Sequence, residues 1–541
     1  MNKKKKLRLK KIRLHPISTY LILMIITIIL SWILSIFDFQ TTYSTVSGID
    51  LSIVQNTVRV ESLLNFDGLK FIISNATKNF ISFAPLSMFL LMAIAMSIMD
   101  SSGCLDFWNK KVFSKINSKI ITFFIIFIAT ISTIINDIGY VVLIPLAASI
   151  YEKKGRNPMS GIMAAFCGVA FGAGTSIFVG SSEVALIPYT TSASRIIDEK
   201  FHVSLLSNLF IMILSTIVLS IVGTVIVEKI IVPHFGKAKE KKEIETEKKD
   251  NLIEEVEVIG EEDNYASSKE EERLQEEYLE RRGFKYSLIS GIIMVVVFIY
   301  SVIPNLPLSG LLLDMNEKTY LKQIFGDNSY FQDGFTFMMS LLFIIIGLFY
   351  GFGSKKFKND KDVFKLSHDS LKDFGGVIIL IFLASQFIAI FKKTNIGVIL
   401  TGIVANVIDS LTFSGVPLLI ISILLIAFAN IFLTTASGKW EILAPVIVPP
   451  LMQSNISPQF LQFVLRAGDS MTKGVTPLSA FFVIFLAYMN IYNQEEEPIG
   501  IFKSIKLLMP YFIIISITWL LILIGWYIIG LPIGPNVYPT V

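Results

Sequence analysis

Long apolar runs separated by short charged loops dominate the pattern of hydrophobic and polar positions along this 541-residue chain. A membrane-spanning helix needs about 20 predominantly apolar residues, with a range of about 17–25. The pattern predicts nine such spans, near residues 18–37, 83–99, 160–187, 208–231, 286–303, 335–350, 375–391, 456–490 and 507–530. We therefore expect an all-α polytopic membrane protein.

Two further apolar segments are interrupted near their middle by polar residues. Residues 120–151 are broken at Asn136–Gly139, and lysines flank both ends, so the segment should enter and leave by the cytoplasmic face. Residues 415–452 are broken at Leu433–Trp440 and carry no charge near their outer ends, so they should open outward. Unwound backbone survives in hydrocarbon only where protein or a wet cavity covers it. We predict two re-entrant helical hairpins in addition to the nine transmembrane helices.

The same order of elements occurs twice along the chain. Residues 18–235 contain the hairpin at 120–151 and a broken helix at 160–187, and residues 286–541 contain the hairpin at 415–452 and a broken helix at 456–490. Hairpins that open to opposite faces predict an inverted repeat with a binding site at the interface of its halves. Chance similarity between glycine- and serine-rich helices is the alternative. The matched positions are Tyr140 and Pro145 with Trp440 and Pro445, and Gly174-Thr175-Ser176, Gly180 and Ser182 with Gly468-Asp469-Ser470, Gly474 and Thr476.

Charge is confined to the N-terminus and the loops. Only 17% of the residues are charged and the formal net charge is +4, so no nucleic-acid-binding function follows. The basic residues 1–17 predict a cytoplasmic N-terminus before an uncleaved first helix, which places the C-terminus outside. Residues 236–285, rich in lysine and glutamate, predict a solvated cytoplasmic linker or a regulatory segment. Cys104 and Cys167 lie in or beside apolar segments and indicate no disulfide framework.

Charged and amide side chains within the apolar segments are the candidate site. An intramembrane Arg or Asp costs about 2.5–3.5 kcal/mol or more and usually marks a transport pathway. Asn430 and Asp469 offer hard oxygen ligands suited to sodium, while a buried Asp469 could instead carry a proton. Arg466 lies one turn before Asp469, so the two can pair, either for transport or merely to neutralise each other. Asn136 and Asp137 could act similarly at the first hairpin tip.

Hydroxyl and aromatic side chains beside the breaks complete the candidates. Trp440 could stack on an aromatic substrate or simply pack. Hydroxyls at half-helix N-termini could bind a substrate carboxylate, although small residues also favour helix packing. The hydroxyl candidates are Ser176, Ser182, Ser437, Ser470 and Thr476. The four histidines are scattered and no Walker-type loop occurs, which argues against a chain that hydrolyses ATP.

These residues resemble the aminobenzoyl-glutamate transporter family (AbgT) of bacterial inner-membrane proteins. The resemblance covers about residues 80–235 and 370–535. It rests on Asn136-Asp137-Ile138-Gly139-Tyr140-Val141-Val142-Leu143-Ile144-Pro145-Leu146-Ala147-Ala148, Ser437-Gly438-Lys439-Trp440, Leu443-Ala444-Pro445, Arg466-Ala467-Gly468-Asp469-Ser470 and Gly530-Leu531-Pro532-Ile533-Gly534-Pro535.

The resemblance implies a homodimer of protomers with nine spans and two hairpins. It implies cation-coupled transport of p-aminobenzoyl-glutamate, a folate breakdown product, or export of sulfonamide-type antimetabolites. Asn430 and Asp469 would belong to a sodium site, and the proton is the other candidate coupling ion. Glu183, which stands where an Asp is usual, would line the substrate path with Ser437, Trp440, Arg466, Asp469 and Pro477, and Pro458 would support it.

Two alternatives remain at this point. A sodium-coupled dicarboxylate or amino-acid carrier would keep the architecture and change the substrate. An intramembrane enzyme, such as a protease using Asp137 and Asp469, fits less well, because the two aspartates fall in oppositely oriented repeats without a second catalytic motif. The prediction of a transport site requires the tips Asn136–Gly139 and Ser437–Trp440 to meet, shielded from lipid.

Overall fold

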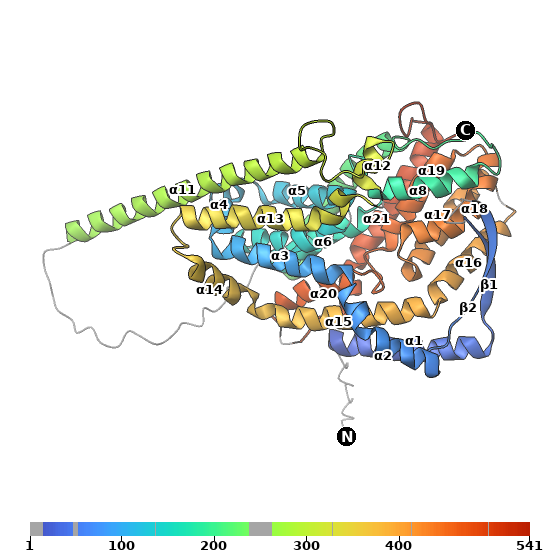
Figure 1. Cartoon of the computed structure of the whole chain (residues 1–541), viewed down its shortest axis with the longest axis horizontal. Helices are drawn as coiled ribbons and strands as arrows, with labels where there is room; N and C mark the ends of the chain where they lie inside the picture. The colour runs from blue at the N-terminus through green and yellow to red at the C-terminus, as the bar shows by residue number, and fades with distance from the viewer. Residues whose placement is uncertain are drawn as a thin grey trace, which may run out of the picture.

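The computed structural model describes residues 14–46, 52–135, 137–236, 262–326, 328–412, 414–495 and 497–541, and these residues are mostly helical (Figure 1). The helices are α1 (Pro16–Ile36), α2 (Phe66–Ile81), α3 (Ala84–Ser101), α4 (Cys104–Lys111), α5 (Ser118–Ile131), α6 (Ile138–Lys153), α7 (Pro158–Phe171), α8 (Ser181–Ser194), α9 (Leu209–Ile226), α10 (Val232–Phe235), α11 (Glu262–Val302), α12 (Tyr320–Phe325), α13 (Tyr330–Gly353), α14 (Asp360–Leu371), α15 (Gly375–Lys393), α16 (Ile396–Asp409), α17 (Gly415–Phe432), α18 (Ala436–Gln453), α19 (Pro458–Thr472), α20 (Phe482–Ile491) and α21 (Ile501–Ile529).

The outer helices differ from the inner ones in how much apolar surface they expose. Among the described residues, eight helical segments are long and apolar enough to cross a membrane, or nine if a pair bent at residues 115–118 counts as one span. Outer helices such as α1, α11 and α21 expose large apolar side chains, including Ile25, Ile292 and Leu521. Every residue of α7 and α19 is buried. This arrangement suits a multi-pass membrane protein, because lipid replaces water around its rim.

A two-stranded antiparallel sheet lies against the second half of the molecule. β1 (Gln40–Val46) pairs with β2 (Ile53–Arg59), with Gln40 opposite Arg59 and Val46 opposite Ile53. In Figure 1 the sheet runs along the ends of α16 and α18. Thr45 Oγ1 donates a hydrogen bond to Glu441 of α18 at 3.2 Å, which ties the sheet to the second broken segment. The pattern of hydrophobic and polar positions does not predict this sheet.

Helices α5 and α6 form an antiparallel pair, and α6 begins after Asp137 at the first hairpin tip. A Cβ on Gly168 of α7 would meet Ile126 and Ala129, whereas one on Gly161 would meet Ala147 and Tyr151. Gly172 meets Thr130, four residues further along both segments, so α5 runs parallel to α7; Gly139 meets Val169, so α6 runs antiparallel to α7. The open end of the pair is closed by Thr122 Oγ1 and Tyr151 OH at 2.5 Å. The depth of this hairpin in a membrane stays a prediction.

Helices α17 and α18 repeat this arrangement around a break at residues 433–435. A Cβ on Gly468 of α19 would meet Ile426, and Thr472 Oγ1 donates to the Ala427 carbonyl at 2.8 Å, so α17 runs parallel to α19. These contacts occur 300 positions after their counterparts, because Gly168 meets Ile126 and Gly468 meets Ile426.

The same offset relates the remaining elements of the two repeats. Pro158 begins α7 and Pro458 begins α19, each after a residue whose side chain caps the helix. The matching of Tyr140 and Pro145 with Trp440 and Pro445 follows this register. The matching of Gly174-Thr175-Ser176 with Gly468-Asp469-Ser470 is wrong by six positions, because Gly174 corresponds to Gly474. Short glycine- and serine-rich matches recur by chance within one helix, and packing contacts decide between the registers.

Where α7 and α19 meet, the contacts exchange between the repeats. A Cβ on Gly174 would lie 2.5 Å from Ser470 Oγ, and a Cβ on Gly474 would lie 3.3 Å from Ala170 Cβ. Residues 170 and 470 are equivalent, so each repeat contacts the other with the same two positions. A two-fold relation requires this reciprocity, which supports the predicted internal repeat. The predicted spans at 160–187 and 456–490 are each two short helices, α7 with α8 and α19 with α20, separated by a break.

Candidate functional site

A cavity of about 740 Å³ lies where the two hairpin tips meet the two helix breaks. This volume falls within the range of about 300–1,000 Å³ that is typical of small-molecule sites. Asp137 at the first tip and Thr434–Ser437 at the second both line it. The described residues of the two tips therefore meet at one cavity, as the predicted transport site requires. Further lining residues include Phe83, Ala173, Ser181, Ser182, Phe325, Lys392, Arg466, Asp469, Lys473 and Phe481.

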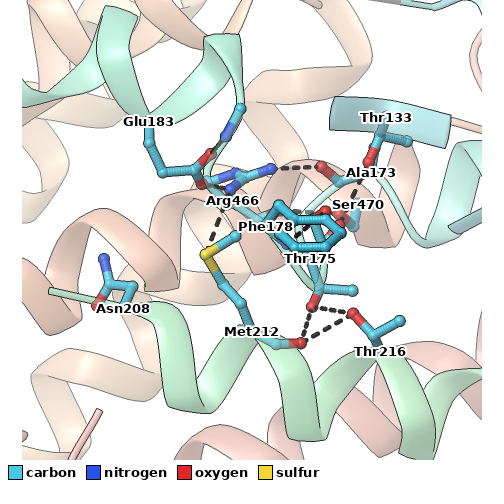
Figure 2. A network of polar contacts seen from close by, with 12 residues as sticks. Thr133, Ala173, Thr175, Phe178, Glu183, Asn208, Met212, Thr216, Arg466 and Ser470 are labelled. Atoms are coloured by element: carbon cyan, nitrogen blue, oxygen red, sulfur yellow. Dashed lines mark hydrogen bonds and ion pairs between the residues drawn. The ribbon is translucent and has the colours of Figure 1, made fainter. Parts of the chain in front are cut away.

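Arg466 of α19 forms a buried ion pair with Glu183 of α8 (Figure 2). The two side chains are 5% and 4% exposed. Arg466 also donates to the carbonyl of Ala173 at 3.0 Å, and Glu183 accepts from the Gly180 N–H at 3.1 Å. Among the ion pairs of the described residues, Arg466 pairs with Glu183 and not with Asp469, so the predicted pairing is wrong. One helical turn brings two side chains within reach, but the partner on α8 satisfies the guanidinium instead.

The helix break beside Arg466 is held by hydroxyl groups rather than by helix hydrogen bonds (Figure 2). Thr175 Oγ1 donates to the Met212 carbonyl of α9 at 2.5 Å and lies 2.9 Å from Thr216 Oγ1. Thr133, next to the first hairpin tip, donates to the Thr175 carbonyl at 3.3 Å. The Thr133 bond gives the unwound carbonyl of Thr175 a partner, which buried backbone needs, and the Thr175 hydroxyl anchors the break to α9. Ser176 is buried beside them and does not line the cavity.

Lys439 on the first turn of α18 is fully buried and holds a second charged cluster. Its Nζ lies 2.7 Å from Asn430 Oδ1, 2.8 Å from the Leu433 carbonyl and 3.0 Å from Asp469 Oδ1. The two residues predicted to bind sodium therefore surround an ammonium group. Asn430 is itself fully buried, and Asp469 forms the only part of this cluster that lines the cavity.

A third ion pair joins the first hairpin tip to the second helix break. Lys473 Nζ lies 2.9 Å from Asp137 Oδ1, and the side chains are 22% and 34% exposed. Both residues line the cavity, so neither side chain is fully enclosed by protein. This pair connects the two repeats directly across the cavity.

Two helix N-termini face the same cavity. The first turn of α8 contributes Ser181 and Ser182, and that of α18 contributes Ala436 and Ser437. Thr435, the N-cap of α18, makes no side-chain capping hydrogen bond. Free N–H groups and the helix dipole favour an anion at such an end.

The remaining predicted residues lie outside the cavity lining. Trp440 is fully buried and donates from Nε1 to Thr190 Oγ1 at 2.7 Å, so it packs within the protein in this conformation. Pro477 is half-buried in the break after α19, and Pro458 is the first residue of that helix. Asn136 lies outside the described residues.

Sequence reasoning missed Lys439 and Lys473. Each lies one to four residues from a predicted site residue, Lys439 before Trp440 and Lys473 after Asp469. A lysine inside an apolar stretch was itself a signal, because intramembrane cations are costly and usually functional.

Comparisons with known proteins agree on one transporter family. The sequence model of the AbgT putative transporter family matches residues 10–541. The chain is 29% identical over 525 residues to the p-aminobenzoyl-glutamate transport protein of Escherichia coli K12, covering 97% of this chain and 94% of the relative.

Two solved structures are also similar. The YdaH transporter of Alcanivorax borkumensis is 27% identical, with 96% of this chain and 100% of that chain covered and a TM-score of 0.46. MtrF of Neisseria gonorrhoeae, described as illuminating a class of antimetabolite efflux pumps, is 28% identical, with 97% and 98% covered and a TM-score of 0.46.

Proposed function

Since this chain belongs to the AbgT transporter family, we propose that it is a cation-coupled secondary transporter of p-aminobenzoyl-glutamate. It is a membrane transporter and not an enzyme. The proposed location is the bacterial inner membrane, with the N-terminus in the cytoplasm and the C-terminus outside. A homodimer is the proposed assembly.

The cavity between the two hairpin tips carries this proposal. p-Aminobenzoyl-glutamate has two carboxylates at one end and an aminophenyl ring at the other. Arg466 and Lys473 supply two cations in the lining, and α8 and α18 point their N-termini into the same space. Phe83, Phe325 and Phe481 supply aromatic surface. Charge-assisted hydrogen bonds and aromatic contacts therefore match both ends of this substrate.

Sulfonamide-type antimetabolites are the second proposed substrate class. They share the aminophenyl group of p-aminobenzoyl-glutamate and lack its glutamyl carboxylates. Binding through the aromatic part of the cavity would accept both classes. The competing substrates are small dicarboxylates and amino acids, which would use the cations and helix N-termini but not the aromatic surface.

Alternating access is the proposed mechanism. The two hairpins and two broken helices meet around the cavity, and such elements form the central site in transporters built from inverted repeats. The ion pair between Asp137 and Lys473 links the repeats with side chains that solvent reaches. A substrate carboxylate can compete with Asp137 for Lys473, so substrate binding would loosen this link. Sodium and the proton are the proposed coupling ions.

Transport by the full-length protein in proteoliposomes tests this proposal. Uptake of labelled p-aminobenzoyl-glutamate should depend on a sodium or proton gradient imposed separately, and should exceed uptake of succinate. Asp469→Asn should abolish gradient-driven uptake, while Asp67→Asn, whose side chain is 91% exposed, serves as the matched control. Succinate uptake without p-aminobenzoyl-glutamate uptake would favour a dicarboxylate carrier. Undiminished, still ion-dependent uptake by Asp469→Asn would exclude a role of Asp469 in coupling transport to the cation.

A further inference from the structure

The oxygen atoms around Lys439 are arranged for an ammonium group. A lysine ammonium has three N–H donors and no acceptor. Its Nζ has three oxygen neighbours, from Asn430, Leu433 and Asp469, at 2.7–3.0 Å. These separations are ordinary lengths for N–H···O hydrogen bonds to a charged donor. Two of its three N–H donors form hydrogen bonds, to Asn430 and Leu433, and the Asp469 carboxylate at 3.0 Å balances its charge.

The orientation of Asn430 is set by its other partners. Its Nδ2 donates to the Asp469 carbonyl at 2.8 Å and to Thr472 Oγ1 at 3.0 Å. A carbonyl oxygen accepts only, so the amide nitrogen must face it and Oδ1 must face Lys439. Thr472 in turn donates to the Ala427 carbonyl at 2.8 Å, which leaves its oxygen free to accept. Each hydrogen bond in this network therefore has a defined donor and a defined acceptor.

The charge of this cluster is already balanced. Asp469 and Lys439 contribute one negative and one positive charge within 3.0 Å of each other. Arg466 pairs with Glu183, and Lys473 pairs with Asp137, so the nearby cations already have partners of their own. A sodium ion at Asn430 Oδ1 and Asp469 Oδ1 would add an unbalanced charge beside the ammonium. The residues present do not fit sodium while Lys439 occupies these oxygens.

The first repeat lacks this cluster. The position equivalent to Lys439 is Gly139, which packs on Val169, the equivalent of Asp469. A Cβ on Gly139 would lie 2.0 Å from Ser132 Oγ and 2.9 Å from Val169 Cγ2, so any side chain there would require its neighbours to move. A lysine facing an aspartate in one repeat replaces a glycine facing a valine in the other. A cation at this position therefore occurs in only one of the two repeats.

We propose that the ammonium of Lys439 is a tethered cation that takes the place of a sodium ion at Asn430 and Asp469. These oxygens then bind no sodium in the protein as it stands, and any sodium dependence of transport arises at another site. The inference refines the coupling part of the proposed function. It is tested by binding alone, so a failure to transport p-aminobenzoyl-glutamate would leave it intact.

Thermal unfolding of the purified full-length protein in detergent tests the proposal. The wild type and Asn430→Ala should show the same difference in unfolding temperature between sodium chloride and choline chloride. Lys439→Ala removes the ammonium and leaves the oxygens, so it should gain stabilisation by sodium. At a sodium concentration 100 times its Kd, the ratio of folded to unfolded protein should rise about 100-fold. The double variant Lys439→Ala/Asn430→Ala should lose this gain.

Lys473→Ala is the matched control, because it removes a lysine of the same cavity region that does not contact Asn430. It should gain no stabilisation by sodium. Sodium stabilisation of the wild type that Asn430→Ala abolishes would overturn the proposal, and this comparison holds even if Lys439→Ala does not fold. A folded Lys439→Ala without any sodium response would also overturn it, since the vacated oxygens would then have no affinity for the ion.

Discussion

Replacing Arg466 with methionine should destabilise the protein strongly. Glu183 would remain as an uncompensated charge in a site where its side chain is 4% exposed. Removing one partner of a buried ion pair costs about 3–5 kcal/mol. At about 2 °C per kcal/mol, the lower end for chains of 150–250 residues, the unfolding temperature should fall by roughly 6–10 °C.

A second substitution should recover most of this loss. Glu183→Gln removes the charge and keeps an oxygen that accepts from the Gly180 N–H. An apolar side chain fits the position of Arg466, because its equivalent in the first repeat is Phe166, which packs on Phe485 of α20 with ring centroids 4.1 Å apart. Replacing both members of a buried ion pair by neutral groups is often close to neutral. We expect Arg466→Met/Glu183→Gln to unfold within about 1–2 kcal/mol of the wild type.

Stability and transport should separate in the double variant. Unfolding is measured by intrinsic fluorescence in detergent, and uptake of p-aminobenzoyl-glutamate is measured in proteoliposomes. The double variant should be stable yet inactive, because the cavity has lost one of the two cations proposed to bind carboxylates. Wild-type uptake by this variant would refute the substrate-binding role of Arg466. An Arg466→Met variant as stable as the wild type would refute the buried, uncompensated charge.

Three further predictions test the packing and the cavity. Lys473→Gln should lower uptake but change the unfolding free energy by less than about 1 kcal/mol, because its ion pair is partly exposed; a larger loss in chemical unfolding would contradict this. Gly168→Ala should cost about 1–3 kcal/mol, since its Cβ would lie 2.6 Å from Ala129 Cβ, whereas Gly525→Ala, with nothing within 4 Å, should be neutral or stabilising; equal unfolding temperatures would argue against close packing of α5 on α7. Trp440→Phe should cost about 1 kcal/mol through the lost bond to Thr190 and leave substrate affinity unchanged; weaker binding at unchanged stability would restore a stacking role.

The hydrophobic pattern predicted where the backbone breaks. The polar interruptions near Asp137 and Leu433 and within 160–187 and 456–490 all fall at or beside helix ends, because unwound segments need polar partners that apolar runs lack. Pairing between distant side chains could not be predicted in the same way. Arg466 has a carboxylate one turn away in sequence, yet its partner Glu183 lies in the other half of the chain. Only the packing of α8 against α19 brings the two together.

The register of the repeat shows the same limit. Aromatic and proline positions carry enough information to align Tyr140 with Trp440, whereas small residues recur too often along one helix to define an alignment. The burial of Lys439 could not be predicted either, because a lysine near a helix end usually reaches toward water along its own stem. Here the stem is buried and the charged end meets three oxygens. Whether such a lysine reaches water or is buried depends on how α17 and α19 pack around its stem.

The reciprocal contacts of Gly174 with Ser470 and of Gly474 with Ala170 let the two repeats approach each other closely, because neither glycine has a side chain. A side chain at Gly474 would also meet the ring of Phe171 at 2.6 Å, and one at Gly174 would meet the backbone carbonyl of Arg466 at 2.6 Å. A bulkier residue at either glycine would therefore push the two repeats apart at their shared interface.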